Sequence, residues 1–189
     1  TTFDDIVLTN TAPAPAANAG ADQTLCNTSS FTLSGNASAP GTGLWTLISG
    51  PGAITTPSSA TSTVTGVTAG GAPTVLRWTI TNGVCGSTFD EVTLINNGTA
   101  SVADAGVASI DQCNTSTFVM SATVPAVGTG VWTVQSGSAT ITNATSATTT
   151  ITGIAAGTSA TLRWTVGNGS CPTTFDDIVL TNTAPAPAA

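Results

Sequence analysis

The chain has 189 residues, of which 40% are hydrophobic and only 6% charged, and nine carboxylates against two basic residues give a formal net charge of −7. Such a charge repels a phosphate backbone, so we expect no nucleic-acid partner. The sequence has no His, Lys or Tyr, and therefore lacks most of the usual general bases and activated nucleophiles. We expect no enzymatic activity, no catalytic residue and no cofactor. No apolar run approaches the roughly 18 residues that a membrane-spanning helix needs.

Residues 1–17, TTFDDIVLTNTAPAPAA, recur without a difference at residues 173–189, a shift of 172 residues. Independent drift would not leave such a copy, so we interpret 172 residues as the period of a longer repetitive chain. Residues 1–17 are then the last strand and the linker of a preceding repeat, with the strand severed from its own domain. Residues 184–189 are the corresponding Pro/Ala linker.

A second repeat lies inside this period. LCNTSSFTLSG is echoed by QCNTSTFVMSA, GTGLWT by GTGVWT, and TVLRWTITNGVCGSTFDEVTL by ATLRWTVGNGSCPTTFDDIVL. These landmarks recur at shifts of 86 or 87 residues. We therefore expect two related modules, at 18–99 and 100–183.

The composition of both modules predicts an all-β fold. β-Branched and turn-forming residues dominate, alternation of apolar and polar residues is frequent, and no segment shows a sustained helical stripe. Turns rich in Gly, Asn and Pro separate seven expected strands in the first module, near 21–26, 30–35, 43–49, 53–57, 61–67, 73–82 and 88–96. Seven short strands in under ninety residues fit a β-sandwich of the immunoglobulin type.

Alternating apolar residues indicate the core of each sandwich. The sixth strand presents one apolar face in each module, formed by Leu76, Trp78 and Ile80 in the first and by Leu162, Trp164 and Val166 in the second. Facing layers are expected from Phe31 with Leu33, Trp45 with Leu47, and Val92 with Leu94. We interpret the Trp residues as core anchors rather than a surface platform for sugars, because they lie inside alternating apolar strands.

Each module contains two Cys, which without His are too few for a zinc site of ordinary ligand spacing. The economical assignment is one disulfide within each module, Cys26 with Cys85 and Cys113 with Cys171. Each bond would tie the end of the first strand to the turn between the last two strands. Closing such a loop of about 60 residues contributes roughly 4 kcal/mol in the chain-entropy model. Disulfides of this kind persist outside the cytoplasm, so an extracellular location is expected.

The two basic residues occupy equivalent positions. Arg77 and Arg163 each precede the Trp of the sixth strand and therefore face away from the core. We expect each Arg to form a surface ion pair with a nearby carboxylate, typically worth at most about 1 kcal/mol.

Adjacent carboxylates open the last strand of each module, Asp90 with Glu91 and Asp176 with Asp177. Neighbours on a strand point to opposite faces, so neither pair converges on a substrate as the two carboxylates of a glycosidase do. We expect Asp90 to hydrogen-bond to loop amides at one end of the sandwich.

A calcium site at a module junction is the alternative for these carboxylates, since Ca²⁺ takes several oxygen ligands. Asp22, Asp104 or Asp111 could contribute further oxygens. No DxDxDG loop supports this alternative.

The patterns NAGADQTLC, FTLSGN, GTGLWT, STVTGV, TLRWTxxNGxC and TFDDIVL resemble the immunoglobulin-like and PKD-like tandem repeats of giant secreted surface adhesins of gliding Bacteroidetes. They are particularly similar to the repeats of the gliding-motility adhesin of that group. The resemblance covers both modules and the partial one. It implies export by type IX secretion, display on the bacterial cell surface, and service as a filament or adhesin stalk. The second module departs from the pattern, because its DQ pair stands directly before Cys113; no role of Asp22 that Asp111 must match is therefore implied.

Short linkers predict a beaded rod in which modules contact mainly their neighbours. We expect a structural repeat of an extracellular filament or giant adhesin, whose partners are neighbouring repeats of the same polypeptide and, laterally, other copies. One alternative is an adhesive module that binds a surface or a glycan through loops at one sandwich end. Another is a fibre subunit completed by strand donation. The second module supplies its own last strand at 173–182, which favours the covalent polymer.

Overall fold

The computed structural model describes residues 2–115 and 117–187, and the chain divides into two compact units, Thr1–Asn96 and Asn97–Ala189. These are called unit 1 and unit 2 below. The division lies slightly before the boundary expected between residues 99 and 100. The physical reason is that Asn97 and Gly98 are bound within unit 2: the side-chain amide of Asn97 donates to the hydroxyl of Ser170, and the carbonyl of Gly98 accepts from the side-chain amide of Asn168.

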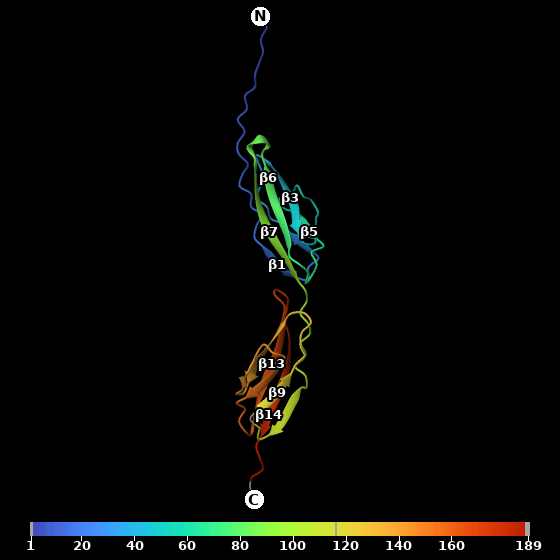
Figure 1. Ribbon diagram of the computed structural model, residues 1–189, viewed down its shortest axis with the longest axis vertical. Coiled ribbons are helices and arrows are strands. Elements are labelled where there is room, and N and C mark those ends of the chain that lie inside the picture. Colours follow the sequence, from blue (N-terminus) through green and yellow to red (C-terminus); the bar gives the residue numbers. More distant parts are fainter. Residues whose placement is uncertain (1, 116, 188–189) are drawn as a thin grey trace. The chain divides into compact units, whose positions relative to one another are not determined.

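Unit 1 is a sandwich of two β-sheets, with strand orders β1-β7-β6-β3 and β2-β5-β4 (Figure 1). A short 3-10 helix, η1 (Gly83–Cys85), lies in the turn between β6 and β7. All seven expected strands are present, whereas the helical turn was not predicted. The strands are β1 (Gln23–Cys26), β2 (Ser30–Thr32), β3 (Thr42–Ser49), β4 (Ala53–Ile54), β5 (Thr63–Thr65), β6 (Thr74–Thr81) and β7 (Ser87–Asn97).

Unit 2 repeats this architecture, with strand orders β10-β13-β14-β8 and β11-β12-β9. Its first strand lies parallel to its last, with Ile110 opposite Leu180, while the hairpin of β13 and β14 is antiparallel. The prediction of an all-β fold built from tandem immunoglobulin-like sandwiches is confirmed. The strands are β8 (Ser109–Cys113), β9 (Thr117–Ser121), β10 (Thr129–Ser136), β11 (Thr140–Ile141), β12 (Thr148–Thr152), β13 (Thr158–Gly167) and β14 (Thr174–Thr183).

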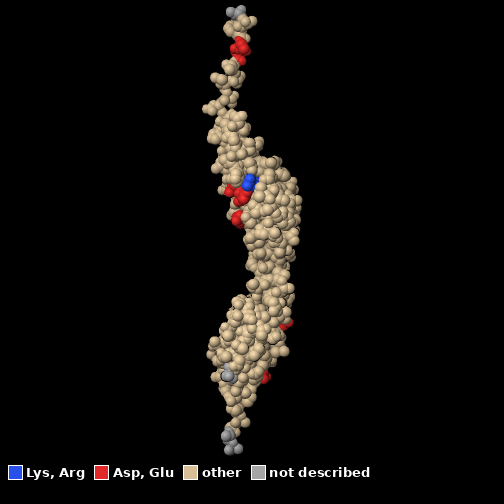
Figure 2. Space-filling view, viewed as in Figure 1, with Lys and Arg blue, Asp and Glu red and all other residues tan. Residues whose placement is uncertain are grey.

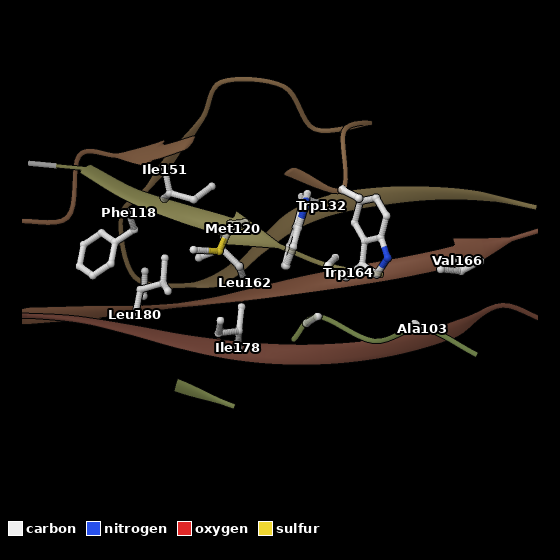
Figure 3. Close-up of a cluster of buried hydrophobic side chains, with 14 of the residues drawn as sticks. Ala103, Phe118, Met120, Trp132, Ile151, Leu162, Trp164, Val166, Ile178 and Leu180 are labelled. Carbon is white, nitrogen blue, oxygen red and sulfur yellow. The ribbon is translucent and has the colours of Figure 1, made fainter. Parts of the chain in front are cut away.

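Each core is centred on a pair of Trp side chains, one from each of two neighbouring strands. The ring centroids of Trp45 and Trp78 are 5.0 Å apart in unit 1, and those of Trp132 and Trp164 are 5.2 Å apart in unit 2. All four side chains are at most 2% exposed, so the interpretation of Trp as a core anchor is confirmed. Figure 3 shows the pair of unit 2 among apolar side chains of both sheets.

The second glycine of each GTG motif makes room for this pair. A Cβ atom on Gly43 would lie 2.2 Å from the ring of Trp78, and one on Gly130 would lie 1.9 Å from the ring of Trp164. Both distances are far inside van der Waals contact. The motif GTG-x-W therefore supplies one Trp of the pair. Two residues before this Trp it supplies a glycine whose missing side chain leaves space for the ring of the other Trp.

Most of the expected core residues are buried, with one exception. Leu47 is 42% exposed, although Trp45 on the same face of β3 is buried. β3 is an edge strand, and its register with β6 shifts between Leu47 and Ser49, so the side chain lies beyond the packed layer. The other predicted core positions are at most 1% exposed: Phe31, Leu33, Leu76, Trp78, Ile80, Val92, Leu94, Leu162, Trp164 and Val166.

The predicted disulfides within modules are wrong. Cys85 and Cys113 are free thiols, whereas Cys26 and Cys171 are disulfide-bonded. In unit 2, Cys113 pairs with Thr183 at the end of β14, while Cys171 precedes the start of that strand. Ten strand residues span roughly 30 Å, and a disulfide requires Cα atoms within about 7 Å. The parallel pairing of the first and last strands thus places the two cysteines of a unit at opposite ends of the sandwich.

Candidate functional site: a linker clasp in each unit

The recurring stretch NGxCxxTFD holds the segment of chain that leads into each unit. In unit 1 it covers the end of the β6–β7 hairpin and the first residues of β7. The side-chain amide of Asn82 donates to the carbonyl of Ala12 (2.7 Å), and the thiol of Cys85 donates to the carbonyl of Thr11 (3.1 Å). Both acceptors lie in the Pro/Ala linker, so the hairpin tip binds the incoming chain.

Two further side chains continue this contact along β7. The hydroxyl of Thr88 accepts from the amide of Ala17 (3.0 Å) and donates to the carbonyl of Pro15 (2.6 Å). A carboxylate oxygen of Asp90 accepts from the amide of Ala19 (2.8 Å). The expectation that Asp90 binds a loop amide is confirmed. We call Asn82, Cys85, Thr88 and Asp90 the linker clasp of unit 1.

Unit 2 has the same clasp, formed by Asn168, Cys171, Thr174 and Asp176. Asn168 donates to the carbonyl of Gly98 (2.8 Å), and Thr174 accepts from Ala103 (2.9 Å) and donates to Ser101 (2.8 Å). Asp176 accepts from the amide of Ala105 (2.8 Å). The Sγ atom of Cys171 lies 3.1 Å from the carbonyl oxygen of Gly98, a contact without a proton because this cysteine is disulfide-bonded.

In both units the clasp binds backbone groups of the linker where no regular strand ladder does so. In unit 1 the prolines of the linker have no backbone N–H to donate to a ladder, whereas the linker segment 98–105 of unit 2 has no proline and is held by the same clasp. Because the clasp binds backbone carbonyls and the amides of Ala residues, different residues can occupy one position of the linker. The hydroxyl of Thr88 donates to the carbonyl of Pro15 in unit 1, and that of Thr174 donates to the carbonyl of Ser101 in unit 2. Each neutral hydrogen bond contributes a net ~0.5–1.5 kcal/mol, and a bond to a charged group about 1.5–3 kcal/mol.

Small apolar residues complete the docking of the linker. Ala19 is 1% exposed and belongs to the core of unit 1, with Ala14 and Ala17 packed against it. Ala103 and Ala105 are buried in the same way in unit 2. The linker is therefore part of the unit that follows it, rather than a free tether.

A buried amide braces the opposite end of each unit. Asn182, which is 3% exposed, donates to the carbonyls of Thr115 and Ile154 (2.8 Å each) and accepts from the amide of Thr115 (3.0 Å). In unit 1, Asn96 binds Thr28 and Val67 in the same three ways. This brace was not predicted from the sequence, although a polar residue near the end of an apolar strand recurs in both repeats.

Two of the carboxylates considered as further calcium ligands, Asp22 and Asp104, bind separate partners. Asp22 accepts from the amide of Thr93, and Asp104 accepts from the amide of Gly106 and the hydroxyl of Thr123. These two bonds to Asp104 lower the pKa of its carboxyl, the amide having the larger effect. Over residues 2–115 and 117–187, no cluster of three or more His, Cys, Asp or Glu could hold a metal ion.

Both arginines form the ion pairs expected from the sequence. Arg163 makes two hydrogen bonds to the carboxylate of Asp177 (2.7 and 2.8 Å), and Arg77 makes two to one oxygen of Glu91 (3.0 and 2.6 Å). The guanidinium groups also lie over the rings of Phe175 and Phe89, at 3.7 and 4.1 Å from the centroids. The hydrogen bonds to Arg163 lower the pKa of Asp177 and raise that of the guanidinium. Elsewhere the face seen in Figure 2 carries few charged atoms.

The described residues of unit 2 line two shallow cavities with neutral walls. The larger, about 440 Å³, lies beside the Asn182 brace and is lined by Asn114, Thr115, Gly153, Ile154, Ala155, Ala156 and Asn182. The smaller, about 250 Å³, is lined by Val119 and by polar residues of the segments 142–143 and 146–150. Neither wall contains a charged or aromatic side chain that would orient a ligand.

Comparison with known proteins identifies the fold. No known protein family and no curated protein sequence matches the chain. Solved structures do match: extracellular domains 3–5 of Drosophila OTK (TM-score 0.60, 15% identity, covering 88% of this chain and 60% of that one) and immunoglobulin domains 1–5 of Sidekick-1 (0.61, 15%, 91% and 40%). The I-band fragment I67–I69 of titin matches with a TM-score of 0.54 and 12% identity, covering 92% of this chain and 67% of that one.

These similarities show that the chain has the fold of tandem immunoglobulin domains. The chain spans 60% of the length of the OTK structure. Among the described residues, no helix is long and apolar enough to cross a membrane.

Proposed function

We propose that this chain is a structural repeat pair of an extracellular filament or giant adhesin, in which it acts as a spacer in a stalk. The observation that carries the proposal is the linker clasp, because each unit uses its own last hairpin to hold the chain that leads into it. A device of this kind is useful where one domain follows another at a fixed interval. The exact recurrence of 17 residues after 172 points the same way.

The resemblance to surface adhesins of gliding Bacteroidetes suggests the setting. In that setting the chain would be exported by type IX secretion, displayed on the bacterial surface and used in adhesion or gliding. Tandem immunoglobulin-like folds in OTK, Sidekick-1 and titin support a serial arrangement of such domains. The PKD-like part of the resemblance remains a prediction.

An adhesive module that binds a glycan or a surface is the second candidate. Its support is the presence of exposed loops and two cavities in unit 2, but the neutral walls of these cavities favour the spacer. Net charge and sparse basic residues agree with a spacer that resists nonspecific association and trypsin-like proteases.

The test is to delete one period, residues 18–189, in frame from the full-length protein. A spacer predicts unchanged surface display and unchanged adhesion, with a shorter filament. Replacing the same period with an unrelated tandem of immunoglobulin domains should restore the length. Loss of adhesion that the unrelated tandem does not restore, with display intact, would contradict the spacer and support the ligand-binding module.

A further inference from the structure

The incoming chain of unit 2 runs beside the last strand from the clasp onwards. The carbonyl of Gly98 accepts from Asn168, and the amide of Ala105 donates to Asp176. Directly after this segment, β8 forms a parallel ladder of five residue pairs with the end of β14. The two stretches of chain keep a sequence offset of 70–73 residues throughout. Clasp and ladder are therefore one continuous parallel contact, bound first by side chains and then by the backbone.

This contact lies in the path of any tension applied along the chain. Tension enters unit 2 beside Gly98 and leaves it at the end of β14, beside Thr183. These points are at opposite ends of a parallel contact, so tension slides the two segments past each other and loads their bonds together. In an antiparallel contact the same two points would be neighbours, and the bonds would open one at a time.

The clasp side chains of β14 are suited to bearing such a load. Asp176 binds an amide through a carboxylate oxygen, and a bond of this charge-assisted kind is roughly twice as strong as a neutral one. Thr174 holds the linker twice, since it donates to the carbonyl of Ser101 and accepts from the amide of Ala103. Ala103 and Ala105 belong to the core, so sliding the linker would also expose apolar surface.

We propose that the linker clasp is a load-bearing device, which passes tension from the incoming chain into the last strand before the tension reaches the backbone ladder. Thr174 and Asp176 carry this load in unit 2, and Thr88 and Asp90 carry it in unit 1. The use of such a device rests on the proposed function, because a spacer in a stalk is a chain under tension. The mechanical property itself belongs to each unit separately.

Single-molecule stretching of unit 2 within the full chain tests the path of the load. The chain carries C26S, C85S and C171S, so that no disulfide shortens this path; C171A is the second choice at this buried position. In the first geometry the chain is held at Thr99→Cys, an exposed position, with Cys113 replaced by Ser. In the second geometry it is held at Cys113. A C-terminal tag is the other attachment point in both, and calorimetry checks that unit 2 unfolds cooperatively.

The two geometries load the same unit in different ways. Tension from position 99 pulls the parallel contact in shear, whereas tension from Cys113 peels the ladder from its end, because Cys113 pairs with Thr183. Forced unfolding is governed by the unfolding rate rather than by equilibrium stability. The unfolding force at one loading rate should therefore be several times higher in the first geometry. Equal forces, or a higher force from Cys113, would overturn the proposal.

Matched variants then separate the clasp from the ladder. Thr174→Val and Asp176→Ala remove clasp bonds, whereas Gly130→Ala disturbs the Trp pair of the core and leaves every bond of the parallel contact in place. Urea unfolding measures the free energy that each variant loses. For an equal loss of free energy, the clasp variants should lose more unfolding force than Gly130→Ala in the first geometry, and no more than it in the second.

Losses of force that follow the lost free energy alike in all variants would overturn the proposal, because the clasp would then contribute only to stability. These measurements use the purified chain, whereas the spacer is tested by deleting one period from the full-length protein. Failure of the load-bearing clasp is therefore distinct from failure of the proposed function.

Discussion

The Asn182 brace offers the sharpest test of what holds a unit together. In the Asn182→Ala variant, the amide and carbonyl of Thr115 and the carbonyl of Ile154 each lose their partner. A buried polar group left unsatisfied costs about 1–3 kcal/mol. The adjacent cavity of about 440 Å³ allows water to replace part of this loss. We therefore expect a loss of roughly 2–4 kcal/mol in the free energy of unfolding of unit 2.

Such a loss is large beside the stability of ~5–15 kcal/mol that is usual for a domain. It should lower the Tm of the unit 2 transition by roughly 10–20 °C, measured by calorimetry at fixed redox conditions. The chain contains its own control, because Asn10 lies in an identical sequence but is exposed and in no strand. Asn10→Ala should leave both transitions unchanged. A destabilisation of Asn182→Ala below about 0.5 kcal/mol, or equal effects of the two variants, would refute the reasoning.

Three further perturbations test the core, the clasp and the ion pair. Gly130→Ala forces a Cβ against the indole ring that crosses it and should destabilise unit 2 by about 1–3 kcal/mol, measured by urea unfolding; a neutral effect would contradict the packing described. Asp176→Ala should accelerate hydrogen exchange of the linker amide that it binds, whereas Asp4→Ala, in the exposed copy of the same sequence, should not; unchanged exchange in both would argue against the clasp. Because the arginine pair lowers the pKa of Asp177 in the folded state, its contribution to stability is present above the ordinary Asp pKa of ~3.9 and is lost as the pH falls through the lowered value. Asp177→Asn should therefore lower the Tm at pH 7, and this deficit should shrink as the pH falls below the ordinary Asp pKa of ~3.9, with Asp5→Asn neutral throughout; a deficit that stays constant in acid would point to lost packing instead.

The number and order of strands could be predicted because they depend on local patterns. Alternating apolar residues and glycine-rich turns identified all seven strands of unit 1, including β4, which has only two residues. The burial of the Trp side chains was also predictable, because a large apolar side chain on the apolar face of an alternating strand is expected to pack in the core. The exposure of Leu47 was not, since it depends on where the facing sheet ends.

The segment 2–10 shows how far context determines structure. Its sequence is identical to that of 174–182, in which Ile178 and Leu180 are at most 1% exposed. In the first copy, Ile6 and Leu8 are more than 80% exposed, and the segment is in no strand. A strand sequence therefore specifies which face is apolar, whereas burial requires a partner sheet.

The disulfide pairing failed for a topological reason. Spacing alone suggested that the first strand ends beside the turn before the last strand. The parallel pairing of β8 with β14 puts that end at the far side of the sandwich, so Cys113 and Cys171 cannot meet within one unit. The clasp residues Thr88 and Thr174 were missed because threonine is common throughout this chain and carries no signal alone.

The most direct test of a covalent polymer built from such repeats is the intact mass of the native polypeptide sheared from cells and denatured, with and without reductant. A covalent polymer should have a mass many times 18.4 kDa that survives reduction, because the backbone itself runs through successive repeats. Collapse to a species near one repeat after reduction would contradict it, and would make strand donation or disulfide-linked subunits the mode of assembly.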